Sequence, residues 1–576
     1  MESRRFHRPG SARPRDGAPV IKQPRNATVE LERRQGGRAT EVIERLRQVQ
    51  EARGWIEPAD VDRVAAELRL PRAHVFGAAS FYADFTFEVP TGRKVRLCDG
   101  ASCFAATGGR HAAGIRERLG GVADVETVYC VGYCYASPAA LDGERAHAGQ
   151  DLAEQLAGKV PQCDPPIPFE AACEEPVVLA RLLGRGAAAW DVWRGVVGDP
   201  DAPGRILREV ERSRLQGRGG AGFPVAHKWA LVRASPPGPR RIVANGDEGD
   251  PGSYLDRLLM EQDPHGVLEG IALASLACGA DRGYLYVRSE YPAARDALRA
   301  AVQEARAAGH LGENVHGTGV GLEIEVFEGA GSYVVGEETA LLHSMEGLRG
   351  SAAPRPPYPA GRGGLFAFPT AVNNVESLAS VAWIVEHGGE QYARHGTATD
   401  PGTKVVCLNE RFRNAGVYEV ELGTPVAEIV DGLGGGLHSG ALRMIEVGGP
   451  LGGFLGSDEL ETRLTFEDLA ARGVALGHGS LVAFDEHIDP RALIRHLWRF
   501  AASESCGTCV PCREGTRRGL DLADRLAAGD ARPQDRAEVG RLLNALDRGS
   551  LCAFGSGVPR PVRSLLRVCR QELEPW

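Results

Sequence analysis

The sequence predicts a multi-domain α/β protein. Its 576 residues exceed what one hydrophobic core usually holds, so we expect about three to five domains. A composition of 43% hydrophobic and 25% charged residues is ordinary for a globular chain. Strand-like segments at residues 241–245 and 324–327 are each followed by a glycine-rich loop and then by a helical pattern, which is typical of α/β architecture.

The composition also excludes several classes of function. The net charge is −9 and the basic residues are dispersed except near the N-terminus, which argues against nucleic acid as a partner. No apolar run approaches the length of a membrane span, so we expect no direct membrane insertion. Residues 1–37, rich in arginine, proline and glycine, lack the apolar centre of a secretory signal and indicate a disordered tail.

The most specific pattern is ESCGTCVPCREG, residues 504–515. Cys506, Cys509 and Cys512 are spaced C-x2-C-x2-C, and Cys552 is available as a fourth ligand. Three thiolates in one run converge on a small volume and the fourth closes the cage from another segment, as a [4Fe–4S] cluster requires. The alternatives are zinc, whose structural sites usually pair two C-x2-C knuckles, and a disulfide framework, which is unusual in so large a chain with so few cysteines.

Four further cysteines form two pairs. Cys98 and Cys103 are spaced C-x4-C, and Cys130 and Cys134 are spaced C-x3-C. The pairs accompany strand-like segments at 95–97 and 125–131, so we expect them on adjacent strand-end loops. Two thiolates per iron suit a [2Fe–2S] cluster, and the alternative is a pair of free buried thiols with a redox disulfide. Eight of the 13 cysteines thus stand at metal-ligand spacing, which indicates a reducing cytoplasm.

A glycine-rich stretch at residues 216–229 matches G-x-G-x-x-G at Gly217, Gly219 and Gly222. The dinucleotide fingerprint needs a strand directly before it, and a polar helix at 207–215 is predicted there instead, so we reject that interpretation. The loop can still bring backbone N–H groups to a phosphate or a flat ring, and Lys228 adds a positive charge. A flexible surface loop is the alternative, although the embedded Phe223 and Trp229 favour packing.

Acidic residues follow the predicted strand at 241–245. Asp247, Glu248 and Asp250 stand beyond its carboxyl end, where open α/β sheets bind ligands. Carboxylates there can accept hydrogen bonds from sugar hydroxyls and would repel a 2′-phosphate, which favours NAD over NADP. The alternative is a solvated acidic turn with a helix cap.

Two more segments carry candidate ligand-binding groups. Gly329 to Leu341 follows the strand at 324–327 and would start a helix with Glu337 and Glu338, which indicates either an anion site or simple capping. Residues 355–378 are expected to be loop until the paired Asn373 and Asn374, whose amides suit phosphate or hydroxyl groups, or again a cap.

Residues 39 to about 155 resemble the thioredoxin-like [2Fe–2S] subunit of the respiratory NADH dehydrogenase complex. The motifs that carry the resemblance are GWIEP at 54–58, GAASFYADF at 77–85, the C-x4-C pair, and CVGYC followed by Pro138. The resemblance implies that Cys98, Cys103, Cys130 and Cys134 hold the cluster.

From about residue 175 to the end, the chain resembles the NADH-binding flavoprotein subunit of that complex and the electron-input subunits of NAD-linked soluble formate dehydrogenases and hydrogenases. GRGGAGFP, NGDEGDPG, GSYVVGEETAL, PPYPAGRGGLF, VNNVESL and ESCGTCVPCREG occur in the order of that family. The resemblance implies FMN contacts at Gly217, Arg218, Gly219, Gly220, Lys228, Asn245, Asp247, Glu248, Tyr333, Gly336, Glu337, Glu338, Asn373 and Asn374. It implies NADH contacts at Phe223, Asp250, Glu338 and Tyr358.

Glu338 and Glu248 are the candidate catalytic residues, because negative charge beside the ligands would lower the flavin's potential and help NAD⁺ to leave. Ala226, His227, Gly246 and Val335 depart from the usual family pattern at small or peripheral positions. Cys163, Cys173, Cys278, Cys407 and Cys569 lack partners at ligand spacing and are expected to be free thiols.

Together these observations predict six segments. They are a disordered tail at 1–37, a thioredoxin-like [2Fe–2S] domain at 38–158, a proline- and acid-rich linker at 159–176, a Rossmann-like FMN/NADH domain at 177–400, a ubiquitin-like domain at 401–487 and a C-terminal helical bundle with the [4Fe–4S] cluster at 488–576.

The expected function is hydride transfer between NADH and FMN, followed by one-electron transfer through the two clusters to or from partner iron–sulfur and catalytic subunits in the cytoplasm. The alternatives are the same enzyme reducing NAD⁺ in a soluble formate dehydrogenase or hydrogenase, a non-catalytic electron-transfer scaffold, and a zinc-stapled assembly factor. The direction of flux and the terminal donor or acceptor do not follow from the residues.

Overall fold

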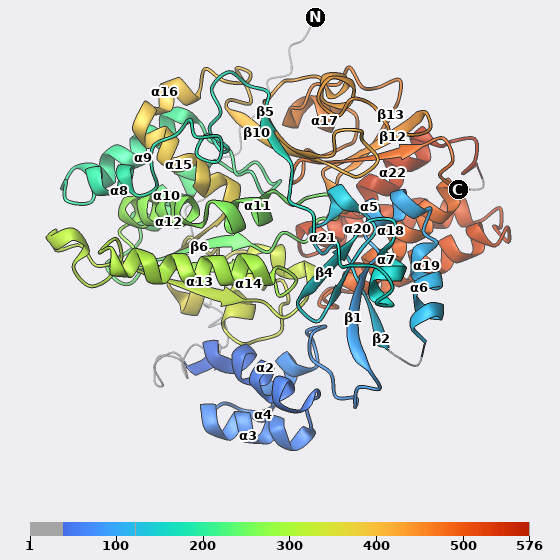
Figure 1. Cartoon of the computed structure of the whole chain (residues 1–576), viewed down its shortest axis with the longest axis horizontal. Coiled ribbons are helices and arrows are strands. Elements are labelled where there is room, and N and C mark those ends of the chain that lie inside the picture. The colour runs from blue at the N-terminus through green and yellow to red at the C-terminus, as the bar shows by residue number, and fades with distance from the viewer. Residues whose placement is uncertain (1–37, 121–122, 575) are drawn as a thin grey trace, which may run out of the picture.

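The computed structural model describes residues 38–120, 123–574 and 576, so the predicted tail at 1–37 lies outside the described residues. In the described part, three β-sheets and a C-terminal group of helices pack into one body (Figure 1). The expected multi-domain α/β architecture is therefore confirmed in its coarse form.

The first domain opens with helices that lie at one end of the molecule (Figure 1), where they share an apolar core with Val243, Tyr286 and Val372 of the central domain. They are α2 (Val42–Arg53), α3 (Pro58–Leu68) and α4 (Arg72–Ala79). Helix α3 starts where the sequence predicts, because Pro58 occupies its first turn and Glu57 and Asp60 form a capping box.

A four-stranded sheet in the order β2-β1-β3-β4 follows in the same domain. Its strands are β1 (Arg93–Cys98), β2 (Ala123–Val128), β3 (Ala139–Asp142) and β4 (Arg145–Ala148). Strand β1 runs parallel to β2 and antiparallel to β3, so it is central in the sheet. Val95 and Leu97 on β1 are fully buried, which accounts for their alternation with charged residues.

The central domain is built on a parallel sheet in the order β8-β7-β6-β9. Its strands are β6 (Arg241–Gly246), β7 (Arg282–Val287), β8 (Glu323–Glu328) and β9 (Thr370–Asn374). All four strands point the same way, so the loops that follow them gather at one edge of the sheet.

Strand β9 corrects one expectation, because its residues were predicted to be loop. Its five residues pair in parallel with β6, with Arg241 opposite Thr370 and Asn245 opposite Asn374. The segment before it is rich in proline and glycine, and so short a strand has too few residues for its alternation to be recognised.

The next domain carries a six-stranded sheet in the order β13-β12-β14-β10-β11-β5. Five of its strands are β10 (Thr403–Leu408), β11 (Gly416–Glu421), β12 (Leu442–Val447), β13 (Gly453–Gly456) and β14 (Ser480–Asp485). A π-helical segment, Glu428–Leu433, follows β11.

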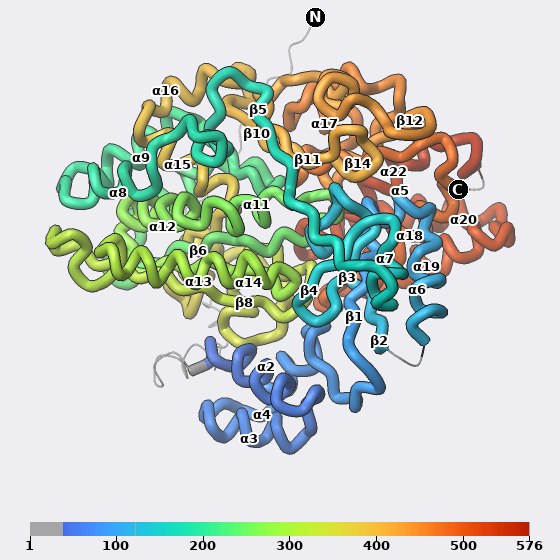
Figure 2. The backbone as a smooth tube through the Cα atoms, viewed as in Figure 1, coloured from blue at the N-terminus to red at the C-terminus, as the bar shows by residue number. Residues whose placement is uncertain are grey.

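The sixth strand, β5 (Phe169–Ala171), lies inside the stretch predicted as a linker. It pairs in parallel with β11 at the edge of the sheet. Figure 2 shows the chain leaving β4 and α7 (Leu152–Leu156) and running to this edge. The stretch therefore ties the first domain to the six-stranded sheet, and its prolines are tolerated because an edge strand needs fewer backbone donors.

The C-terminal region is helical, as the sequence predicts. Its helices are α18 (Pro490–Glu504), α19 (Val510–Ala527), α20 (Asp535–Gly549), α21 (Ala553–Gly557) and α22 (Pro559–Val568). Their apolar faces share one core with Phe104 of the first domain and with Met444 and Phe484 of the six-stranded sheet. None of the helices in the described part is long and apolar enough to cross a membrane.

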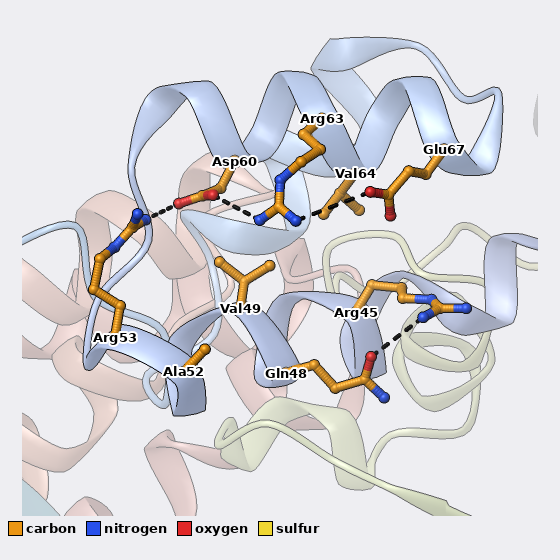
Figure 3. A pocket seen from close by; sticks show the side chains of 9 residues that line it. All are labelled: Arg45, Gln48, Val49, Ala52, Arg53, Asp60, Arg63, Val64 and Glu67. Atoms are coloured by element: carbon orange, nitrogen blue, oxygen red, sulfur yellow. Dashed lines mark hydrogen bonds and ion pairs between the residues drawn. The ribbon is translucent and has the colours of Figure 1, made fainter.

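A surface cavity of about 320 Å³ lies between α2 and α3 (Figure 3). Asp60 at its centre is held between Arg53 and Arg63. These charges are already paired, so we assign the cavity no functional role.

One fully buried ion pair joins the central domain to the six-stranded sheet. Lys404 Nζ on β10 lies 2.5 Å from Glu376 Oε2 on α15 (Val375–His387), and neither side chain is exposed. The other Glu376 oxygen accepts a hydrogen bond from Val405 N. Each charge depends on the other, because a lone buried charge is costly.

We expect Lys404→Met to destabilise the protein by about 3–5 kcal/mol, because it leaves a buried carboxylate without its cation. The midpoint of thermal unfolding should fall, and adding Glu376→Gln should recover most of the loss. Lys159→Met, at a lysine whose side chain is 66% exposed, is the control. An unchanged midpoint in Lys404→Met would contradict the importance of this pair.

Candidate functional site

Cys98, Cys103, Cys130 and Cys134 come together at the end of the first sheet. Cys98 is the last residue of β1, Cys103 lies in α5 (Ala101–Thr107), and Cys134 begins the short helix η2 (Cys134–Ala136). All four are buried. The Sγ atoms of Cys130 and Cys134 are 3.6 Å apart, and Gly132 N donates to Cys130 Sγ at 3.3 Å. Backbone donors of this kind stabilise a thiolate.

The second cysteine set lies where α18 meets α19. Cys506 and Cys509 are in the connecting loop, Cys512 is in the first turn of α19, and Cys552 caps α21. Burial, together with its three cysteine neighbours, raises the pKa of the Cys512 thiol to about 12. Only Cys512 is fully buried, so a cation or cluster here would have one side near the surface.

The spacing of the sulfur atoms fits iron–sulfur clusters better than a single zinc ion. Thiolates at about 2.3 Å from one tetrahedral zinc lie about 3.8 Å from one another. Among the described residues, no three cysteine sulfur atoms lie within 4.8 Å of each other. The pair at 3.6 Å suits two thiolates on one iron of a [2Fe–2S] centre, with the other pair on the second iron.

The acidic loop after β6 is buried at the carboxyl edge of the parallel sheet. Asn245 Nδ2 donates to Gly336 O at 2.9 Å, which joins this loop to the one after β8. Burial raises the pKa of Asp247 to about 8, and its Oδ2 has no partner among the described residues. A Cβ on Gly336 would stand 3.4 Å from Asp247 O, so the absence of a side chain there keeps the space beside Asp247 open. An unpartnered acceptor beside such a cradle fits the hydroxyl chain of FMN.

Asp250 and Tyr333 link the acidic loop to the loop after β8. The Tyr333 hydroxyl donates to Asp250 Oδ1 at 2.5 Å, and Tyr333 N donates to Glu504 Oε2 at 3.1 Å. Burial raises the pKa of Glu504 to about 7. Because Glu504 ends α18 just before Cys506, this contact connects the expected nucleotide site to the second cysteine set.

Glu248 was expected to be catalytic, but the structure directs its carboxylate into the protein. Oε1 accepts from Ser253 Oγ and Asp256 N, and Oε2 accepts from Arg257 N. These backbone donors begin α11 (Leu255–Gln262). Burial and the neighbouring Asp256 raise the pKa of Glu248 to about 7. Both carboxylate oxygens of Glu248 are therefore occupied by groups of the protein itself.

The glycine-rich loop folds back on itself before α10 (Val225–Arg233). Gly217 N donates to Phe223 O at 2.9 Å, and Gly220 and Gly222 have φ of +99° and +63°. As predicted, a helix, α9 (Ala202–Ser213), precedes the loop instead of a strand. Helix α10 starts without a side-chain cap, and the N–H of its first residue, Val225, donates to Leu215 O at 3.0 Å.

Not every residue of the glycine-rich loop faces the expected ligand with its side chain. The Arg218 guanidinium is buried and donates to Tyr392 Oη at 2.8 Å and to Pro401 O at 3.0 Å. Its backbone N donates to Ser377 Oγ. Arg218 therefore anchors the loop to the domain behind it, and its side chain points away from the loop's open side.

Lys228, Glu338 and Arg355 form a charged group beside this loop. Lys228 Nζ lies 3.2 Å from Glu338 Oε2, and Arg355 Nη1 lies 2.7 Å from Glu338 Oε1. Glu337 caps α14 (Glu338–Met345) by accepting from Thr339 N and Ala340 N, and it also pairs with Arg355. Glu337 therefore occupies the N-terminus of α14 as a helix cap. This agrees with the capping alternative and not with the predicted anion site.

Asn373 and Asn374 end β9 beside the acidic loop. Asn373 Oδ1 accepts from Trp229 Nε1 at 2.9 Å, and Asn374 Oδ1 caps α15 through Glu376 N. Asn374 Nδ2 donates to Asp256 Oδ2 at 2.6 Å. The capping alternative holds for Asn374, while the Asn373 amide nitrogen remains available for a ligand.

Phe223 and Tyr358 are the exposed aromatic residues of the predicted nucleotide site. Phe223 is 47% exposed and Tyr358 is 60% exposed, whereas the large apolar side chains in the core of the central domain are buried. Lys228 Nζ lies 6.0 Å from the centre of the Phe223 ring, which places Phe223 at the charged group. Exposed rings of this kind can stack on a nucleotide base.

Sequence reasoning missed the contacts that join the central domain to the [2Fe–2S] cysteines. Gly252 N donates to Cys134 Sγ at 3.2 Å. Arg288 donates to Cys130 O and to Glu248 O, and Arg257 donates to Gly132 O. The NGDEGDPG motif indicates the ligand loop, but nothing in it shows that its last residues touch a cysteine more than 100 positions earlier.

His478, in the loop before β14, was also missed. Its Nδ1 lies 3.4 Å from Glu248 Oε1 and its Nε2 lies 3.2 Å from Asp256 Oδ2. Burial alone would lower the pKa of His478, but the two carboxylates raise it to about 9. The two nitrogens face different carboxylates, which suits a doubly protonated ring better than one bound metal ion. No pattern in the sequence singles out this lone histidine.

The remaining cysteines behave as expected for free thiols. Cys173, Cys278, Cys407 and Cys569 are buried and Cys163 is exposed, and all five are free. Burial raises the pKa of the Cys278 and Cys407 thiols well above their ordinary value, so both stay protonated.

A parallel sheet with a ligand cradle, flanked by two cysteine sets with cluster spacing, defines an iron–sulfur flavoprotein. Three protein-family models match three successive parts of the chain. "Thioredoxin-like [2Fe-2S] ferredoxin" matches residues 28–156, "Nuo51 FMN-binding domain" matches 210–383, and "NADH-ubiquinone oxidoreductase-F iron-sulfur binding region" matches 492–575.

Similar proteins and structures include both respiratory and hydrogenase subunits. The F-type subunit of NADH-quinone oxidoreductase from Escherichia coli is 39% identical over 376 residues, which are 65% of this chain and 84% of that protein. The HndC subunit of the NADP-reducing hydrogenase from Solidesulfovibrio fructosivorans is 39% identical over 373 residues, 65% of this chain and 76% of that protein. A chain of an NAD⁺-reducing [NiFe]-hydrogenase crystal structure matches with a TM-score of 0.82 at 30% identity, covering 93% of this chain and 92% of that one.

The chain belongs to the NADH-quinone oxidoreductase-F family. It is an NADH-oxidising FMN flavoprotein of the diaphorase type, with a [2Fe–2S] and a [4Fe–4S] cluster.

We expect Cys509→Ala to abolish the electron paramagnetic resonance signal of the reduced [4Fe–4S] cluster, because one iron loses its thiolate. Flavin content and the [2Fe–2S] signal should be retained, since those residues lie in other domains. Cys163→Ala, at an exposed free cysteine, is the control and should change neither signal. A normal [4Fe–4S] signal in Cys509→Ala would contradict the ligand assignment.

The raised pKa of His478 predicts a pH-dependent stability. Below about 6.5 the ring is charged in both the folded and the unfolded chain, so its ion pairs contribute fully. As the pH rises through about 9 the folded protein loses that proton, and the contribution disappears. The difference in unfolding midpoint between the wild type and His478→Gln should therefore shrink between pH 6.5 and 9.5. His487→Gln, with a side chain 79% exposed, is the control, and a difference that does not vary with pH would contradict the assignment.

Proposed function

We propose that this chain is the NAD(H)-linked electron-entry subunit of a multi-subunit redox complex. The proposal rests on two hydrogen bonds at the acidic loop. Gly252 N donates to the sulfur of a [2Fe–2S] cysteine, and Asp250 accepts from the Tyr333 hydroxyl. Tyr333 in turn meets Glu504 beside the [4Fe–4S] cysteines. When bound, FMN supplies the chemistry of accepting a hydride and releasing its electrons singly.

The FMN contacts are proposed from the groups that remain available around the cradle. Asp247 Oδ2 is an acceptor without a partner among the described residues, and no side chain caps the start of α10 beside the glycine-rich loop. Asn373 and Lys228 border the same space. We propose Gly217, Gly219 and Gly220 as the residues whose lack of a side chain lets the ligand approach the backbone.

Nucleotide binding is proposed at Asp250, Glu338, Phe223 and Tyr358. The two rings are exposed and can stack, and the two carboxylates can accept hydrogen bonds from ribose hydroxyls. Glu338 is 21% exposed on its side chain, so it is reachable by a ligand, unlike Glu248. We therefore propose Glu338 as a ligand contact and Glu248 as the residue that positions the loop.

The named domains extend the proposal to the rest of the chain. We propose a Rossmann-like FMN domain on the parallel sheet, a ubiquitin-like domain on the six-stranded sheet and a helical [4Fe–4S] bundle, with the boundaries predicted from the sequence. The 13 free cysteines support a reducing, cytoplasmic location.

Reduction of NAD⁺ by electrons from a hydrogenase-type partner is the second candidate. It is favoured by the likeness to the NAD⁺-reducing [NiFe]-hydrogenase chain, which extends over 93% of this chain and includes both cluster regions. Copurification would separate the candidates: a nickel–iron or molybdenum subunit supports this one, and membrane subunits support respiration.

We expect NADH, and not NADPH, to bleach the flavin and cluster absorbance of the anaerobic protein. Carboxylates at the ribose side repel a 2′-phosphate. Because one relative is named as NADP-reducing, both coenzymes need to be compared. A flavin- and iron-containing protein that NADH does not bleach would overturn the proposed function.

Glu338→Gln should raise the NADPH-to-NADH ratio of bleaching rates about tenfold, the effect of about 1.4 kcal/mol. The substitution leaves Lys228 and Arg355 without the carboxylate that pairs with both, so the site gains positive charge for a 2′-phosphate. Glu325→Gln, at an exposed glutamate paired with Arg282, is the control. A ratio unchanged in Glu338→Gln would remove Glu338 from the nucleotide site.

A further inference from the structure

Glu446 is a fully buried carboxyl group that has no hydrogen-bond partner in the described part of the chain. It lies on β12 of the six-stranded sheet with no exposed surface. Neither Oε1 nor Oε2 accepts or donates a hydrogen bond among the described residues. A buried polar group without a partner is costly, so its presence calls for a reason.

Glu446 faces the nucleotide loop. It is paired across the sheet with Val482, and a Cβ on Gly252 would stand 2.7 Å from Val482 Cγ2. Three residues after Glu446, Gly449 approaches Asp250 so closely that a Cβ there would lie 3.0 Å from Asp250 Cβ. At Glu446 and the turn that follows it, the six-stranded sheet therefore packs closely against the segment that carries Asp250.

The charge state of Glu446 follows from this environment. Burial, together with the negative charge of Asp250, raises the pKa of Glu446 to about 8. At pH 7 Glu446 is therefore a neutral acid beside Asp250, which accepts the hydrogen bond of the Tyr333 hydroxyl. Burial raises the pKa of Asp250, while the Tyr333 hydroxyl, His478 and Arg288 act in the opposite direction.

Other charged groups near this face are engaged elsewhere. From α22, Arg560 donates to Leu451 O and Arg567 to Phe454 O. Helix α5, which packs on β14, contributes no carboxylate or basic side chain. Asp250 is thus the charged group that acts on Glu446.

We propose that Glu446 is the proton-binding group of the nucleotide site, and that its protonation prevents a second negative charge from lying directly behind Asp250. The inference rests on the proposed nucleotide contact at Asp250. When Glu446 loses its proton, a second negative charge stands behind Asp250 and disfavours the pyrophosphate of NAD⁺. By linkage, NAD⁺ binding favours the protonated form, so binding near the pKa takes up a proton.

Titration calorimetry with NAD⁺ on the oxidised holoprotein tests this directly. Measurements at pH 8 in buffers of different ionisation enthalpy give the number of protons taken up on binding. We expect net uptake in the wild type, with the dissociation constant rising between pH 7 and 9.5. If bound NAD⁺ shifts the pKa of Glu446 by one unit, the rise is about tenfold.

Glu446→Gln should lose this component of proton uptake and flatten the pH dependence, with His478 accounting for what remains. Glu446→Asp keeps a titratable acid and should keep the uptake, which separates loss of the proton from damage to packing. Glu459→Gln, in the turn that follows β13, is the control, because Arg567 and Gly456 N hold the pKa of Glu459 below its usual value against the effect of burial. Flavin and cluster spectra show which variants are folded.

The outcomes distinguish this inference from the proposed function. If Asp250→Asn leaves NAD⁺ affinity unchanged, the nucleotide site itself is misassigned and the inference fails with it. If Asp250→Asn changes affinity but Glu446→Gln takes up protons like the wild type, only the inference fails. Equal loss of uptake in Glu446→Asp and Glu446→Gln would also overturn it, because the effect would then come from packing.

Discussion

The hydrogen bond from Gly252 N to Cys134 Sγ is the contact on which the arrangement of the redox sites depends. It joins a cluster ligand of the first domain to the loop that follows the central strand β6. That loop also carries Asp247 and Asp250, so one segment borders the cradle, the nucleotide site and a cluster thiolate. Hydrogen bonds to cluster sulfur atoms help set reduction potentials, so this donor influences the electronics of the [2Fe–2S] centre as well as its position.

Many ionisable groups are buried where these sites come together, and they are accommodated in two ways. Some carboxylates are paired: Glu290 lies 2.9 Å from Arg288, and Asp256 lies 3.2 Å from His478. Others, such as Asp247 and Glu446, are left without a partner among the described residues on at least one oxygen, and burial raises the pKa of each to about 8. A neutral acid is less costly to bury than a lone charge. Few carboxyl groups of the site therefore carry an uncompensated negative charge.

The sequence predicted what depends on spacing and local pattern. The eight cysteines, the strands β6 and β8, and the helix before the glycine-rich loop all have strong local signals. Strands β5 and β9 were missed because three or five residues beside prolines show no clear alternation. His478 and Arg288 were missed because their importance lies in contacts with residues far away in the chain, which no motif records.

Glu248 and Glu338 show why a motif does not determine a role. Both are acids in glycine-rich loops after parallel strands, and both were expected to act on the ligands. In the structure the difference comes from which donors reach each carboxylate. Backbone N–H groups of α11 and Ser253 surround Glu248, whereas the partners of Glu338 are the flexible cations Lys228 and Arg355. A carboxylate bound by backbone groups cannot turn to a ligand without disrupting a helix start. One paired with mobile side chains can exchange them for ribose hydroxyls, and this makes Glu338 the acid that can respond to the nucleotide.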